Sequence, residues 1–236
     1  MNKTHKDTKY FDDALASYNR KIDRYISAIK SGDLNKTQIE RRCEMLLGFY
    51  IRKIILLYSI KINRNQLTAT IEEFLNTYKE AEFSIYGAYE EIVWFMSIYY
   101  CLDIKSDQID ALISDIEEEG FNDMLISSII SGFKSDYRVT SGFEFDKPYK
   151  RLEKLLKEKE NGNIEDIKTY LTDFWYKESS DAVWYNTHND KSGYDYVGYW
   201  SFESAALVKL FGLDDSELEG VDYYPYDLLR MNEPLV

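Results

Sequence analysis

Apolar residues repeat along this chain at the spacing of an α-helix, and this periodicity restricts the fold more than any other feature. Between residues 11 and 29, and again between residues 39 and 58, apolar and aromatic side chains recur every three or four positions, which lines them along one helical face. Residues 84–101 are apolar almost all round, as is typical of a helix at the centre of a core. A strand-like alternation is confined to residues 194–200, where glycine interrupts it. The sequence therefore predicts an all-α fold of roughly ten helices.

Several helix boundaries can be placed from residues that favour helix ends. Thr37 and Glu40 have the spacing of a capping box, so we expect a helix to begin there. Ser106 and Asn163 precede two later periodic segments and are predicted N-caps. Gly120 ends the segment that Ser106 begins, because glycine is frequent just past a helix. The periodic segments are therefore separate helices joined by short connections.

The 236 residues suffice for one large domain or two intimately packed small ones. We expect a compact bundle of two packed helical halves, an N-terminal domain of residues 1–120 and a C-terminal domain of residues 121–236. In the second half, residues 134–147 have no clean period and are a predicted loop. The last long helix opens at Phe202 and stops at Gly212.

Acidic residues outnumber basic ones, and the excess is unevenly placed. The chain has 29 Lys and Arg against 42 Asp and Glu, a net charge of −13, which argues against direct binding of nucleic acid. Residues 178–236 hold three basic and twelve acidic residues and are rich in tyrosine and tryptophan. This segment is either an ordinary solvated surface or a recognition face for a cationic partner, and we keep both interpretations.

The sequence contains no feature of a membrane or secreted protein. The longest apolar run, residues 92–102, is much shorter than a membrane span, and the N-terminus lacks the apolar stretch of a secretory signal. Cys43 and Cys101 are the two cysteines, and both lie in apolar-periodic segments where buried, reduced thiols are expected. We expect a cytoplasmic protein that makes no membrane contact.

Catalytic and cofactor motifs are not found in the sequence. The two histidines, His5 and His188, and two scattered cysteines cannot supply the ligands of a zinc site. The P-loop, dinucleotide-binding, nucleophile-elbow and zincin motifs are missing, so we assign no catalytic residue, cofactor or metal and predict a protein that is not an enzyme. An enzyme that uses convergent carboxylates with a divalent metal is kept as an alternative. Glu203 lies in a tight apolar stretch, where we expect it to cap its helix or to bond with a Tyr or Trp in the core.

Two short stretches near the C-terminus resemble a known family. Residues 199–206 read YWSFESAA and residues 223–228 read YYPYDL, with Trp184-Tyr185 and then His188 upstream. This combination, a YWSFE-x-AA and a YYPxDL signature, resembles that of the PoNi family, immunity proteins that protect bacteria from PoNe-type polymorphic nuclease toxins. The N-terminal half resembles the partner domain usually found with it, at residues 9–12 and in the helix that ends at residues 57–59.

The resemblance implies an all-helical, cytoplasmic antitoxin that neutralises a DNase by direct protein–protein contact and catalyses no reaction. The family pattern leads us to expect an acid at the position that Asn186 occupies. Because the signature consists mainly of aromatic and small residues, we interpret it as a mark of the fold and not of the toxin-binding site. These structural positions are Trp184, Tyr199, Trp200, Phe202 and Glu203.

The toxin contacts are instead expected from acidic residues with tyrosines beside them. A DNase active site must attract a polyanion, so a protein that blocks it gains by presenting carboxylates. An alternative partner is some other basic protein, bound by a helical scaffold or regulatory module, and the aromatic surplus also allows a homodimer. A second candidate patch, at the end of a helix, comprises Glu117, Glu118 and Glu119. The first candidate face comprises Asp195, Asp214, Asp215, Glu217, Glu219 and Asp222 with Tyr194, Tyr196, Tyr223 and Tyr226.

Overall fold

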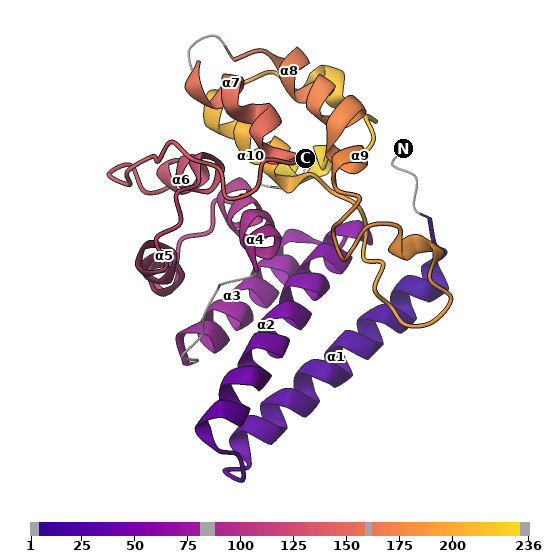
Figure 1. The fold of residues 1–236 in the computed structure, drawn as a ribbon. Coiled ribbons are helices and arrows are strands. Elements are labelled where there is room, and N and C mark those ends of the chain that lie inside the picture. The colour runs from indigo at the N-terminus through magenta and orange to yellow at the C-terminus, as the bar shows by residue number, and fades with distance from the viewer. Residues whose placement is uncertain (1–4, 81–87, 159–161, 232–236) are drawn as a thin grey trace.

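The computed structural model describes residues 5–80, 88–158 and 162–231, and every regular element within these ranges is helical (Figure 1). The prediction of an all-α fold with about ten helices is confirmed. The chain up to residue 131 contains six α-helices, in which α1 and α2 form a long hairpin and α3 packs against α2. Their bounds are α1 Thr8–Lys30, α2 Lys36–Ser59, α3 Arg64–Glu80, α4 Tyr89–Cys101, α5 Ile109–Glu118 and α6 Met124–Ser131.

The second half is built from shorter pieces. Residues 134–147 form the predicted loop, and Gly212 ends α10 in the left-handed conformation, with φ of 62°. Asn163 caps α8 as predicted, because its Oδ1 accepts the N–H of Glu165 at 3.1 Å. The α-helices are α7 Glu153–Lys157, α8 Ile164–Thr169, α9 Tyr176–Glu178, α10 Phe202–Phe211 and α11 Tyr226–Arg230. Between them lie the 3₁₀ turns η1 Tyr149–Leu152, η4 Thr187–Asn189 and η5 Ser216–Leu218, and the π-helical segment η3 Tyr170–Trp175.

The predicted capping box of α2 is wrong by two residues. The box is formed by Asn35 and Gln38, whose side chains each accept the other's backbone N–H at 3.0 Å. Asparagine is at least as favourable as threonine at an N-cap, and Asn35 has the extended backbone that the position needs, with φ of −77° and ψ of 168°. The hydroxyl of Ser106 lies one turn before α5, where it accepts the N–H of Gln108 at 3.3 Å.

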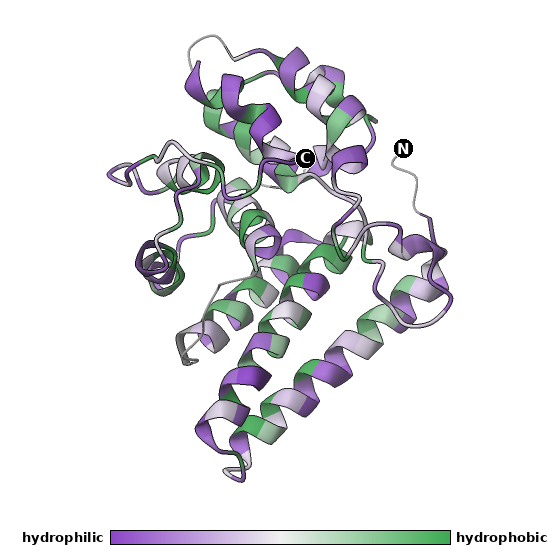
Figure 2. Cartoon of the chain, in the orientation of Figure 1, coloured by the Kyte–Doolittle hydropathy of each residue, from purple (hydrophilic) through white to green (hydrophobic). Residues whose placement is uncertain are grey.

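Helix α4 lies at the centre of the molecule. Every residue from Ile92 to Cys101 is buried, and the helix packs against α10, α6, α2 and α11, as its all-round apolar sequence predicts. The predicted start of this helix, residues 84–87, lies outside the described residues. Buried side chains from both halves of the chain join one continuous core, whereas hydrophilic residues line the outer turns of α1 and α2 (Figure 2). The division of the chain at residue 120 stays a prediction.

A fully buried carboxylate ties the second half together. The Oε1 atom of Glu203 in α10 accepts three hydrogen bonds, from the hydroxyl of Tyr170 at 2.9 Å, the indole N–H of Trp175 at 2.7 Å and the hydroxyl of Ser201 at 2.8 Å. We expected either a Tyr or a Trp as the partner of Glu203, and the structure has one of each. Among the described residues, its Oε2 atom is buried without a hydrogen-bond partner. Burial raises the pKa of Glu203 against the opposing effect of these donors.

The π-helical segment explains how Tyr170 and Trp175 reach the same oxygen. They are five residues apart, and in an α-helix this spacing would point them about 140° apart. A π-turn closes its hydrogen bond over five residues, and the wider turn brings residues i and i+5 much closer to the same side. The segment η3 therefore puts both donors on the side that faces Glu203.

A second link joins α2 to the chain just before α10. The hydroxyl of Ser59 donates to the carbonyl of Val197 and accepts the indole N–H of Trp200 at 2.8 Å. Gly198 passes directly beside this pair with φ of +115°, and a Cβ there would overlap Ser59 Oγ and Trp200 Nε1. Only glycine combines that backbone conformation with that approach.

We predict that Glu203→Leu lowers the free energy of unfolding by about 3 kcal/mol or more, because three buried donors lose their acceptor. Glu203→Gln keeps an acceptor oxygen and is expected to unfold with a different pH dependence. The folded protein holds the Glu203 proton at pH values where the unfolded chain has released it, so wild-type stability falls as pH rises above the ordinary carboxyl range. Urea unfolding at several pH values measures both effects, and parallel pH curves for wild type and Glu203→Gln would contradict the second.

We predict that Gly198→Ala destabilises the protein by about 2 kcal/mol or more, through backbone strain and overlap with the Ser59–Trp200 pair. The matched control is Gly48→Ala in the middle of α2, where a Cβ meets nothing within 4 Å. That substitution should stabilise the protein by up to about 1 kcal/mol. Thermal unfolding measures the difference in stability between the two variants. Equal unfolding midpoints for Gly198→Ala and Gly48→Ala would refute the prediction.

Candidate functional site

The predicted acidic, Tyr-rich face falls into two places in the structure. Asp214, Glu217, Glu219 and Asp222 are exposed and surround η5, between α10 and α11. We call these four residues the η5 carboxylates. Asp195 is also exposed, but it lies in the chain before α10, and its backbone carbonyl accepts a hydrogen bond from an arginine of α2.

Asp215 must be removed from the predicted contact set, because its side chain is already occupied inside the protein. It accepts the hydroxyl of Tyr224 at 2.7 Å and forms a two-pronged ion pair with Arg230, at 2.6 and 3.1 Å. Burial alone would raise the pKa of Asp215, but Arg230 and Tyr224 outweigh burial, and the pKa is lowered. Only 7% of the residue is exposed, so Asp215 anchors α11 and cannot meet a partner.

Tyr196 must also be removed from the predicted contact set, because it is a buried core residue. Its ring packs 4.9 Å from that of Tyr199 and 6.1 Å from that of Phe11 in α1, and burial raises its pKa to about 12. The neighbouring Tyr194 is half-buried, and its carbonyl accepts the hydroxyl of Tyr18 at 2.8 Å. These two tyrosines fasten residues 194–196 to α1.

The two remaining tyrosines of the predicted face are half-buried near the η5 carboxylates. The guanidinium of Arg230 lies 3.4 Å from the centre of the Tyr226 ring, a cation–π contact. Tyr223 lies between Trp175 and Tyr176, with ring centres 5.0 and 5.2 Å away. Both residues are therefore held in place by these contacts while they remain partly exposed.

The second candidate patch is at the end of α5. Glu117 and Glu118 are exposed and Glu119 is half-buried. Tyr176 of α9 packs against Tyr223, so α9 marks the place of the first candidate face. Figure 1 shows α5 on the opposite side of the molecule from α9, so the two candidate patches are separate.

Part of the negative charge of residues 178–236 is neutralised within the protein. Glu178 pairs with Arg151 at 2.6 Å and Asp227 pairs with Lys61 at 3.1 Å. Glu217 lies 3.6 Å from Lys168, a longer and mostly exposed pair. In the described part of the chain, no cation lies within ion-pair distance of the three other η5 carboxylates, which are Asp214, Glu219 and Asp222.

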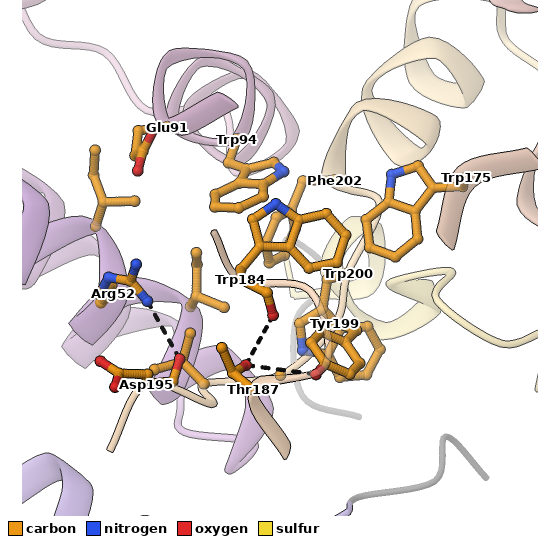
Figure 3. Close-up of a pocket in the computed structure, with 14 residues that line it drawn as sticks. Arg52, Glu91, Trp94, Trp175, Trp184, Thr187, Asp195, Tyr199, Trp200 and Phe202 are labelled. Atoms are coloured by element: carbon orange, nitrogen blue, oxygen red, sulfur yellow. Dashed lines mark hydrogen bonds between the residues drawn. The ribbon is translucent and has the colours of Figure 1, made fainter. Parts of the chain in front are cut away.

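All four tryptophans of the chain line one cavity, a convergence that the sequence does not reveal (Figure 3). The cavity measures about 20 Å³, which holds roughly one water molecule and no larger ligand. At its edge the indole of Trp184 donates to Glu90 at 3.1 Å, and burial raises the pKa of Glu90 to about 7. The cavity is therefore part of the core architecture. Its four indoles belong to Trp94, Trp175, Trp184 and Trp200.

Four of the five signature positions line this cavity, and Glu203 follows the last of them in the sequence. Trp184, Tyr199 and Phe202 are buried, Glu203 is fully buried and Trp200 is half-buried. Asn186, which occupies the position of the expected acid, is exposed and accepts a hydrogen bond from the hydroxyl of Tyr176 at 2.9 Å.

No cluster of three or more His, Cys, Asp or Glu side chains in residues 5–80, 88–158 and 162–231 has the geometry to hold a metal ion. No helix in the same ranges has the length and apolarity needed to cross a bilayer.

Comparison with known proteins gives a family and a fold. Residues 121–228 match the family model of the PoNe immunity proteins (PoNi), C-terminal. The solved structure of protein PA2201 from Pseudomonas aeruginosa superimposes with a TM-score of 0.71 at 15% sequence identity, covering 96% of this chain and 89% of that one, so the two share a fold. No curated protein sequence matches the chain. Immunity proteins are inhibitors and not enzymes. The C-terminal part of the chain, residues 121–228, is thus similar to the PoNi family of immunity proteins.

Proposed function

We propose that this immunity protein neutralises a cognate DNase toxin of the PoNe type by binding it directly, through the η5 carboxylates and the adjacent Tyr223 and Tyr226. The family match carries the general function. The observation that favours this surface is the exposure of Asp214, Glu219 and Asp222, three carboxylates without a cation partner in the described structure.

Electrostatics provides the physical reason for this choice. A DNase attracts DNA with a cationic cleft, and exposed carboxylates occupy the positions that phosphates would take. A net charge of −13 also speeds the encounter with such a partner and repels nucleic acid. Tyrosines beside the carboxylates add contact area, because buried aromatic anchors contribute most of the affinity in many interfaces.

Three further expectations belong to this proposal. The protein acts in the cytoplasm, where a DNase meets the chromosome. Asp195 forms an outlying contact, and the glutamates at the end of α5 are the competing patch. Residues 1–120 and 121–236 act as two packed domains, with the second carrying the binding surface, and a homodimer stays a prediction from the aromatic surplus.

A matched pair of charge reversals separates the two patches. We predict that Glu219→Lys with Asp222→Lys weakens toxin binding at least 30-fold and reduces its salt dependence, because attraction to the toxin becomes repulsion. Glu117→Lys with Glu118→Lys makes the same charge change on α5 and should alter the dissociation constant by less than threefold. Calorimetric titration with a catalytically inactive toxin at two salt concentrations measures both.

All four substituted residues are exposed, so circular dichroism should show both double variants to be folded. The reverse ranking would assign the interface to α5. Wild-type affinity in both variants would refute the acidic recognition face altogether, and failure of the wild-type protein to bind the toxin would refute the function.

A further inference from the structure

An apolar side chain is held out in solvent next to the tryptophan cavity. Val183 is 85% exposed, far more than the other large exposed hydrophobic residues, Met45 and Phe145. Its loop is rigid, because the N–H of Ala182 bonds to the carbonyl of Ser179 and the N–H of Tyr185 bonds to the carbonyl of Ala182, both at 3.0 Å. The next residue is the buried Trp184. These contacts favour the outward placement of Val183 before any partner binds, and such preorganisation lowers the entropy lost on binding.

Three half-buried tyrosines lie beside this loop. The ring of Tyr176 is 4.6 Å from that of Tyr185, and it stacks on Tyr223 at 5.2 Å with an angle of 9° between the planes. This packing fixes the orientation of the rings, and all three residues remain partly exposed. Rigid tyrosines of this kind provide large contact area at small entropic cost.

Two residues with strained backbone contact Tyr176. Asn186 and Tyr223 both adopt the left-handed conformation, with φ of 59° and 69°. Asparagine tolerates this region, but an aromatic residue there is a rare outlier. Both residues contact Tyr176, one through the hydrogen bond to its hydroxyl and the other through the ring stack. Strained backbone persists where its surroundings hold it, and it is concentrated at binding sites.

The charges around these residues define the partner. Asp181 and Asp222 are exposed; Asp181 lies two residues before Val183, and Asp222 lies directly before Tyr223. The lysine or arginine nearest to Val183 along the chain is Lys177. Its charge is balanced by Asp173, whose carboxylate lies 3.9 Å from the Lys177 ammonium group. The rim of this surface is therefore acidic and suits a cationic protein.

We propose that Tyr176, Val183, Tyr185 and Tyr223 form the energetic centre of the toxin interface, with Asp181 and Asp222 at its rim. The occupant is the cationic, DNA-binding face of the nuclease toxin, so this inference rests on the proposed function. It goes beyond the proposed function by assigning most of the binding energy to these four residues, whereas the η5 carboxylates mainly raise the association rate.

The test measures the affinity of full-length variants for a catalytically inactive nuclease toxin of the PoNe type, the partner of the proposed function. Val183→Asn should weaken binding at least tenfold, whereas Met45→Asn, on an exposed turn of α2, should change it less than twofold. Tyr185→Ala should also weaken binding at least tenfold, and Tyr185→Phe, which keeps the ring, less than threefold.

The outcomes separate the two proposals. Because Val183 is almost fully exposed, its substitution cannot unfold the core, and thermal unfolding should show an unchanged midpoint. Tight wild-type binding together with wild-type affinity in Val183→Asn and Tyr185→Ala would overturn this inference and leave the proposed function intact. No binding by the wild-type protein would refute the proposed function itself.

Discussion

The buried carboxylate of Glu203 is the interaction on which the second half of the protein depends. A carboxyl group without water must find donors, and one oxygen of Glu203 takes three, from Tyr170, Trp175 and Ser201. These bonds fix the π-helical segment η3 against α10. Trp175 in turn stacks on Trp184 at 5.1 Å and packs against Tyr223. A polar contact in the core thereby sets the positions of the aromatic residues at the surface.

This arrangement suits a protein that inhibits by binding. The helices around α4 and α10 form a closed core whose tryptophan cavity has room for about one water molecule. The exposed carboxylates and Tyr223, with its left-handed backbone, are attached to that core from short loops. A binding surface held in place before the encounter loses little entropy on association. The family of the C-terminal half and the geometry of its surface lead to the same kind of function.

The sequence predicted what depends on local pattern and missed what depends on distant partners. Periodicity was sufficient for the helices and for the central position of α4. The apolar surroundings of Glu203 predicted either a helix cap or a Tyr or Trp partner, and the structure has the second, with Ser201 as a further donor. Asp215 looked like its exposed neighbour Asp214, because only the fold brings Arg230, fifteen residues later in the chain, against it. Tyr196 is buried by α1, nearly two hundred residues earlier. The convergence of four tryptophans and the left-handed backbone of Tyr223 likewise have no local sequence signal.

Hydrogen exchange of the protein alone and in complex with its toxin tests the central claim most directly, since it locates the interface without any substitution. The account predicts that binding slows amide exchange in residues 176–190 and 212–226, while α1 and the end of α5 exchange as in the free protein. Protection confined to α1–α3 or to α5, with the C-terminal segments unchanged, would contradict it.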